Sequence, residues 1–104
     1  MAIAAKFTYG DTHTYVPVAT LDVYLRFWMP GIEAEGLQRL EACESMGEFD
    51  LPGFEGLSDE LLRLRAWIDR HDAPHADAIV ARIDRLLVEI EAASAYPDAH
   101  ISIG

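Results

Sequence analysis

The chain has 104 residues, with 18 acidic and 8 basic side chains, so its formal net charge is −10. An apolar fraction of 51% excludes a disordered chain, while 7 Gly, 5 Pro and 1 Cys exclude the collagen-like and disulfide-stapled classes. This length supports one hydrophobic core, so we expect a single domain over residues 1–104.

The charge and the start of the chain restrict its partners and its compartment. A surface with this charge repels phosphates and anionic lipid, so we expect no direct binding to nucleic acid or to a membrane. The first residues lack a basic leader followed by a long apolar run, and no apolar run approaches the roughly 20 residues of a membrane span. Together with the lone cysteine, these features predict a cytoplasmic protein.

The N-terminal segment predicts a β-hairpin over residues 3–18. β-Branched and aromatic residues occupy both arms, and Gly10 and Asp11 form a two-residue turn between them. An isolated hairpin is marginal in water, so this one must pack on helices or pair with another strand. The tail over residues 100–103 could supply that strand, although a frayed end is the expectation.

Two helices are predicted next in the chain. Thr20 is a good N-cap for a helix over residues 21–29, which Pro30 and the glycine after it should stop. A second helix over about residues 32–46 has a weak apolar stripe, which Gly36 could interrupt.

The C-terminal half predicts an antiparallel helical hairpin. Residues 47–57 hold three Gly and one Pro and should form a loop. Ser58 caps a helix to about residue 71 and Pro74 starts another to about residue 95, each with apolar residues repeated on one face. The short connection at Asp72 and Ala73 makes them antiparallel. The predicted fold class is therefore mainly α, with about four helices, the helical hairpin among them, and a short N-terminal β-hairpin.

No catalytic or cofactor-binding motif occurs in the sequence. It has neither a Gly-x-Ser-x-Gly nucleophile turn nor a glycine-rich phosphate loop. Cys43 lies between Glu41 and Glu44, whose charges should raise its thiol pKa, whereas a nucleophilic thiolate needs electropositive surroundings. We therefore expect no enzyme, no catalytic residue and no cofactor.

A pair of histidines has the spacing of metal ligands. His71 and His75 are four residues apart, with Asp72 between them. Pro74 breaks the helix there, so the two imidazoles do not share one helical face, and no cysteine pair or His-Glu-x-x-His motif frames them. We expect a polar turn whose histidines complement a helix C-terminus, and no metal.

The first predicted helix is apolar on two sides. Its large residues cover one broad side, and only Asp22 and Arg26 are polar. At about 100° per residue, Val23 and Phe27 lie nearly opposite that side. Such a helix must be covered on both sides, by the β-hairpin, by a second copy of the chain or by another protein. If a second copy covers it, a homodimer with a two-fold interface is the predicted assembly.

Most of the net charge lies in one acidic stretch. Residues 32–60 contain nine acidic side chains and a single basic one, Arg39. Within this stretch, apolar residues at positions 49, 51, 54 and 57 alternate with acids. They either close the open end of the core or form an acid-rimmed apolar patch that docks on a basic-rimmed groove.

Three kinds of function are compatible with these surfaces. The first is a small protein-binding inhibitor, the second a small-molecule-binding domain or enzyme, and the third an acidic mimic of nucleic acid. Apolar residues interrupt the acidic stretch, which disfavours mimicry. For the favoured inhibitor, the first helix and residues 47–57 supply the predicted partner-binding residues: Val23, Tyr24, Phe27, Trp28, Met29, Phe49, Leu51 and Phe54.

A resemblance favours the first of these functions. In its length, its acidic charge, its helical pattern and the segment TLDVYLRFWM at residues 20–29, the chain resembles the QslA-type quorum-sensing antiactivators of bacteria. The resemblance implies a dimer that binds the ligand-binding domain of a LuxR-type transcription factor. Occupying the dimerisation surface of that receptor would keep it off DNA. No individual contact residue is implied, because no diagnostic motif is shared.

Overall fold

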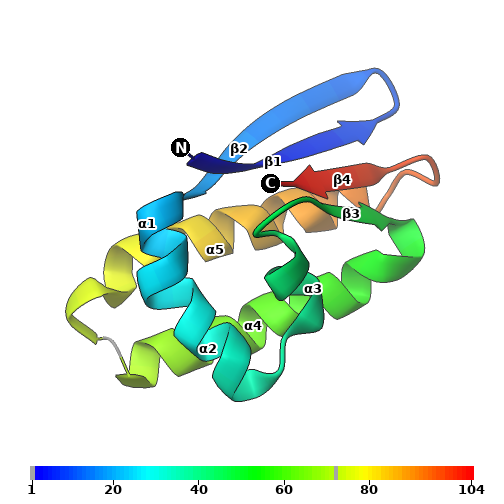
Figure 1. Cartoon of the computed structure of the whole chain (residues 1–104). Coiled ribbons are helices and arrows are strands. Elements are labelled where there is room, and N and C mark those ends of the chain that lie inside the picture. Colours follow the sequence, from blue (N-terminus) through cyan, green and yellow to red (C-terminus); the bar gives the residue numbers. More distant parts are fainter. Residues whose placement is uncertain (1, 72) are drawn as a thin grey trace.

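A four-stranded antiparallel sheet lies on one side of a group of helices (Figure 1). The structure is a computed structural model that describes residues 2–71 and 73–104. Its elements in chain order are β1 (Ala2–Tyr9), β2 (Thr12–Thr20), α1 (Leu21–Val23), the π-helical turn η1 (Tyr24–Trp28), α2 (Met29–Glu35), α3 (Gln38–Ala42), β3 (Gly47–Asp50), the 3₁₀ turn η2 (Leu51–Gly53), α4 (Phe54–His71), α5 (Ala73–Ala93) and β4 (His100–Ile103).

The sheet overturns the predicted fold class. Its strand order is β2-β1-β4-β3, and every neighbouring pair is antiparallel. The chain therefore has an α/β fold, and the prediction of a mainly α fold with only an N-terminal hairpin is wrong. Two segments account for the error, because the tail and the start of the predicted loop both form strands. Alternate residues of these strands, Phe49, Ile101 and Ile103, are buried under the sheet.

The hairpin predicted over residues 3–18 is present as β1 and β2. Gly10 takes the left-handed φ of +55° that its tight turn requires. Ala5 pairs with Val16 on one side and with Ile103 of β4 on the other, so β1 is a central strand. The C-terminal tail thus supplies the third strand that the hairpin needed, instead of fraying.

The first helix does not stop at Pro30. The Met29 N–H donates to the Tyr24 carbonyl, five residues back, so the chain makes a π-helical turn just before the proline. Pro30 then falls in the first turn of α2, where the hydrogen bond that it cannot donate is not needed. The next residue is a glycine because α2 lies close against α4. A Cβ at Gly31 would come within 2.7 Å of Leu64 Cδ1.

The helix predicted over residues 32–46 and the loop predicted over residues 47–57 are also redrawn. Gly36, with φ +66°, ends α2, and α3 is a separate short helix. The predicted loop contains β3, η2 and the first turn of α4. Glu60 of α4 stabilises the start of α3, because its Oε1 accepts hydrogen bonds from the backbone N–H groups of Arg39 (3.0 Å) and Leu40 (3.2 Å).

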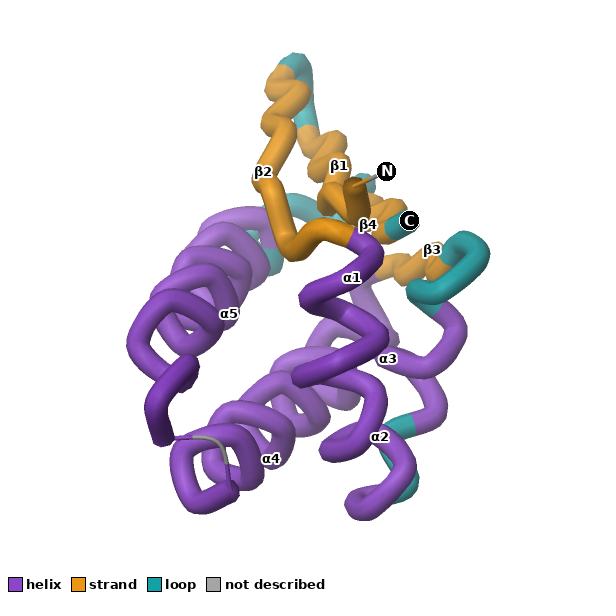
Figure 2. The backbone as a smooth tube through the Cα atoms, turned by 60° about the vertical axis from the view of Figure 1, so that its left-hand side comes forward, coloured by secondary structure: helices purple, strands orange, loops and turns teal. Residues whose placement is uncertain are grey.

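The helical hairpin of α4 and α5 carries much of the core. Its buried faces are those that the periodicity indicates: Leu57, Leu61, Leu64 and Ile68 on α4, and Ile79, Ile83, Leu86 and Ile90 on α5. Asp72, in the predicted connection, lies outside the described residues. α5 packs beneath β1 and β2, and α4 contacts α2 and α3, so Figure 2 shows all strands on one side of the helices. None of the helices formed by residues 2–71 and 73–104 is long and apolar enough to cross a membrane.

Candidate functional site

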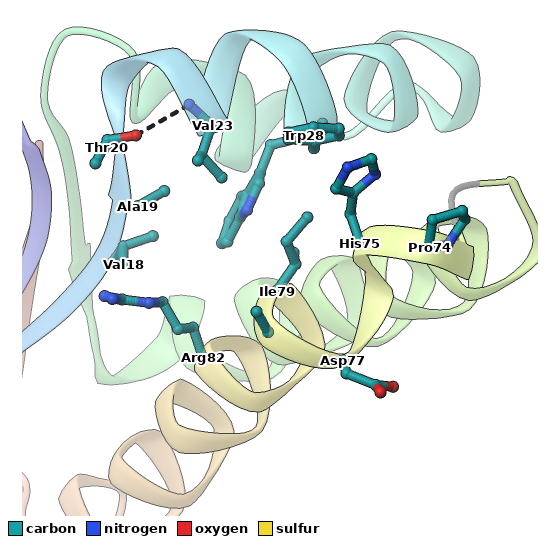
Figure 3. Close-up of a pocket in the computed structure, with 12 residues that line it drawn as sticks. Val18, Ala19, Thr20, Val23, Trp28, Pro74, His75, Asp77, Ile79 and Arg82 are labelled. Atoms are coloured by element: carbon teal, nitrogen blue, oxygen red, sulfur yellow. Dashed lines mark hydrogen bonds between the residues drawn. The ribbon is translucent and has the colours of Figure 1, made fainter.

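The first of two apolar grooves lies where β2 runs into the first helix, opposite the start of α5 (Figure 3). Its volume is about 460 Å³. Val18 and Ala19 of β2, Val23 and Phe27 of the first helix and Ile79 of α5 supply much of its lining. A cavity of this size and polarity is in the range that holds small molecules in proteins. We call it the β2–α5 groove.

Local structure fixes the walls of the β2–α5 groove. The Thr20 hydroxyl accepts a hydrogen bond from the Val23 N–H at 3.1 Å, which sets the direction in which the helix leaves β2. The Phe27 ring lies 4.6 Å from the His75 ring of α5, centroid to centroid. The π-helical turn adds one residue to the helical turn that carries Phe27 and Trp28, and such turns often occur at functional sites.

The structure separates the predicted partner-binding residues of the first helix into two groups. Tyr24 and Trp28 face the core, with exposed fractions of 0% and 2%. The Tyr24 hydroxyl donates to the Leu40 carbonyl at 2.7 Å, and burial raises the pKa of that phenol. Val23 and Phe27 are half-buried and line the β2–α5 groove, while the half-buried Met29 packs against the core. One side of the helix is therefore buried in the core through Tyr24 and Trp28, while the side with Val23 and Phe27 borders the groove.

A second apolar groove, which we call the α4–α5 groove, lies at the other end of the helical hairpin. It has a volume of about 540 Å³ and runs between the start of α4 and the end of α5. Leu51, Phe54, Leu62, Leu87 and Ile90 supply its apolar walls, with Glu55, Ser58, Glu91 and Ser94 around them. No basic residue lines it among the described part of the chain. Leu62 is 53% exposed although it is a large apolar residue.

The α4–α5 groove collects two of the three predicted residues of the 47–57 segment. Leu51 is half-buried and Phe54 is 3% exposed, and both line it. Phe49 is instead in β3, where it is 9% exposed and packs under the sheet. The groove therefore combines part of the acidic stretch with Leu87, Ile90 and Glu91 of α5, which lie outside that stretch.

Cys43 and His71, two titratable residues discussed in the sequence analysis, both contact other parts of the fold. Burial, and then the charge of Glu60, raise the pKa of the Cys43 thiol to about 12; the predicted causes, Glu41 and Glu44, are not the ones that act on it. The His71 ring stacks on Trp67 at 4.5 Å, and its Nδ1 lies 3.0 Å from the Trp67 carbonyl oxygen near the end of α4. Within residues 2–71 and 73–104, no group of His, Cys, Asp or Glu side chains has the arrangement of a metal site.

Most lining residues of the two grooves, including Leu62 and Arg82, are not among the partner-binding residues predicted from the sequence. Leu62 lies outside the stripe formed by Leu57, Leu61 and Leu64, and a leucine off the buried stripe is the signal that could have found it. Arg82 of α5 lines the β2–α5 groove. The sequence signal for Arg82 is that the residue four positions later is neutral and cannot pair with it. Arg85, in contrast, has Glu89 four positions later and forms an ion pair with it.

The fold and the grooves define an acidic α/β chain with one acid-rimmed and one arginine-bearing apolar groove. Comparison of the chain with models of known families, with curated proteins and with solved structures finds no match. Function is therefore inferred from the two grooves and the charges around them.

Proposed function

We propose that this chain is a small protein-binding inhibitor that holds an amphipathic, basic segment of another protein in the α4–α5 groove. The observation that carries the proposal is the exposed Leu62 in a groove bordered by Glu55 and Glu91. Exposed apolar surface rimmed by polar residues marks interaction sites. The carboxylates favour a partner segment whose apolar residues are flanked by Arg or Lys.

The charge around this groove supports a basic protein partner over the alternatives. Carboxylates at its edge and a net charge of −10 repel nucleic acid, membranes and acidic ligands, whereas they attract a basic protein surface over several ångströms. Rim charges of this kind raise the association rate more than they slow dissociation. The apolar walls then supply the burial that holds the complex together.

The partner to test first is a LuxR-type transcription factor. The resemblance to quorum-sensing antiactivators is the support for that class, and the proposed mechanism is steric. Filling the groove with a segment of the ligand-binding domain would cover the surface through which the receptor dimerises and would keep it off DNA. An inhibitor that acts in this way needs no catalytic residue and no cofactor.

The test measures binding of the ligand-binding domain by calorimetry and stopped-flow. Leu62→Ser should weaken binding by about 2 kcal/mol or more, whereas Val88→Ser should not. Val88 is the matched control because it is 63% exposed on α5 and does not line the groove. Glu55→Gln combined with Glu91→Gln should slow association and reduce its salt dependence. Equal binding by the Leu62 and Val88 variants would refute the site.

Phe27→Ala tests the alternative that the first helix holds the partner. Phe27 is a predicted partner-binding residue and lines the β2–α5 groove, far along the helical hairpin from Leu62. Loss of binding in Phe27→Ala, with wild-type binding in Leu62→Ser, would transfer the protein interface to the β2–α5 groove. A circular dichroism melt of each variant distinguishes lost contacts from lost folding.

A homodimer is part of the proposal, because the resemblance implies one. β2 is an edge strand of the sheet, and its Tyr15 is 70% exposed. The unpaired backbone of an edge strand is available to a second copy, and a two-fold dimer is the commonest assembly of soluble proteins. Sedimentation equilibrium at micromolar concentration should then give twice the chain mass. A monomer at every concentration would remove the dimer from the proposal.

A further inference from the structure

The apolar walls of the β2–α5 groove suit the body of a small molecule. Val18, Val23 and Ile79 line a space of about 460 Å³ (Figure 3), and Phe27 also lines it. That volume is near the lower end of the range for small-molecule sites, and such sites are mostly apolar with a few polar groups that fix orientation. The chemical nature of those polar groups indicates which ligand the groove takes.

One polar group at the groove is the guanidinium of Arg82. It forms no hydrogen bond or ion pair with any described residue, whereas Arg65, one helix away, holds Asp84 at 2.8 Å. The side chain of Arg82 extends from α5 toward Val18 of β2 (Figure 3). In a chain with more than twice as many acids as bases, an arginine left without an acid beside an apolar groove is available to an anionic ligand.

A second polar group is the indole N–H of Trp28. It makes no hydrogen bond with any described residue. Among those residues, however, no buried side-chain nitrogen or oxygen lacks a hydrogen-bond partner. The indole nitrogen must therefore be accessible to solvent although Trp28 as a whole is 2% exposed. Trp28 lines the groove and its ring points into it (Figure 3), so its indole N–H resonance should respond to a ligand there.

The groove lining also includes one acid, Asp77, and two other polar residues, Thr20 and His75. The Thr20 hydroxyl already accepts the Val23 N–H, and the Asp77 side chain extends to the far side of α5 (Figure 3). The His75 ring packs on Phe27. A guanidinium beside apolar walls matches a carboxylate on an apolar body, because a carboxylate is an anion that only accepts hydrogen bonds.

We propose that the β2–α5 groove binds a small carboxylic acid with an unbranched or aromatic apolar body, its carboxylate on Arg82 and its body against the apolar walls and the Trp28 ring. The proposal does not depend on the inhibitor function, since the two grooves share no residue. The α4–α5 groove is the internal contrast, because Glu55 and Glu91 would repel the same ligand.

The experiment titrates the full chain with decanoate below its micelle concentration and follows heat and the indole ¹⁵N–¹H resonances. Trp67→Phe assigns the resonance of Trp28, the other tryptophan. Decanoate should bind at one site, shift the Trp28 indole resonance and bind about tenfold tighter than 1-decanol, which has the same body without the charge. No saturable binding, or equal affinity for decanoate and decanol, would overturn the proposal.

Three variants assign the binding to this groove. Arg82→Gln should weaken decanoate binding about tenfold and leave decanol unchanged. Arg70→Gln is the matched control, because Arg70 also lacks an ion pair among the described residues and does not line the groove. Ala78→Phe should abolish binding of both ligands, since Ala78 lines the groove from an exposed position where a larger side chain can be accommodated. Wild-type decanoate affinity in Arg82→Gln or in Ala78→Phe would refute the site.

Discussion

Glu60 is expected to be the most important charged residue for stability. Its side chain is 7% exposed and accepts hydrogen bonds from the backbone N–H groups of Arg39 and Leu40 and from the Arg39 guanidinium at 2.8 Å. Glu60→Ala leaves two N–H groups at the start of α3 without an acceptor, at about 1–3 kcal/mol each. Half of the Arg39 side chain is exposed, so solvent screens the ion pair and it adds at most about 1 kcal/mol. We expect a total loss of about 3–5 kcal/mol.

Two further variants separate the hydrogen bonds from the charge. Glu60→Gln keeps an oxygen that can accept both backbone N–H groups and should cost only about 1 kcal/mol. Asp59→Ala removes an exposed acid one residue earlier and should change stability by less than about 0.5 kcal/mol. In urea unfolding monitored by circular dichroism, the loss should therefore decrease from Glu60→Ala to Glu60→Gln to Asp59→Ala.

The expected loss of stability in Glu60→Ala is also large enough to measure by thermal unfolding. One kcal/mol shifts the midpoint of a domain of this size by roughly 4 °C or more, so Glu60→Ala should melt at least about 12 °C below the wild type. Equal unfolding midpoints for Glu60→Ala and Asp59→Ala would refute the idea that a side chain of α4 holds the start of α3.

Three other outcomes follow from burial and charge. Ile83→Ala should destabilise the fold by about 2–5 kcal/mol in urea unfolding, and Leu87→Ala by less, because Leu87 is only half-buried at a groove. The Cys43 thiol, with its pKa raised to about 12, should react with a thiol reagent only as fast as the chain unfolds; faster labelling would contradict its burial. The hydrogen bond to the Asp50 carboxylate (2.8 Å) raises the pKa of His100 in the folded protein. Protonated His100 should therefore stabilise the fold, by no more than about 1 kcal/mol at this exposed site. This stabilisation is present below the ordinary pKa of about 6.5 and disappears as the pH rises through the higher folded pKa. His100→Gln should remove that slope from a plot of midpoint against pH.

The helical hairpin could be predicted because its signal is local. Leu57, Leu61 and Leu64 recur at helical spacing within one helix, and each needs only its own sequence neighbours to define the face. Both buried faces agree with that periodicity. The start of α4 differs from the prediction, because Gly56 in its first turn is typical of a loop.

The two short strands could not be predicted, since their pairing is not local. β3 and β4 have four residues each, and Phe49 pairs with Ile101 more than fifty positions later. Four residues give too little alternation to distinguish a strand from a loop, and β-propensity depends on the neighbouring strand. The fold class was wrong for this reason, although the N-terminal hairpin was identified.

The apolar sides of the first helix were a less specific signal than the periodicity of the helical hairpin. Its two apolar sides predict a cover on each, from the β-hairpin, from a second copy of the chain or from another protein. In the structure, Tyr24 and Trp28 enter the core while Val23 and Phe27 face α5, so the helix lies between two parts of the same chain. A helix that is apolar on two sides therefore marks an internal layer here. Leu62 is one of the large apolar residues that stay exposed, and the periodic stripe of α4 does not explain it. An apolar residue outside a clear periodic stripe therefore marks exposed apolar surface more directly than a helix with many apolar residues does.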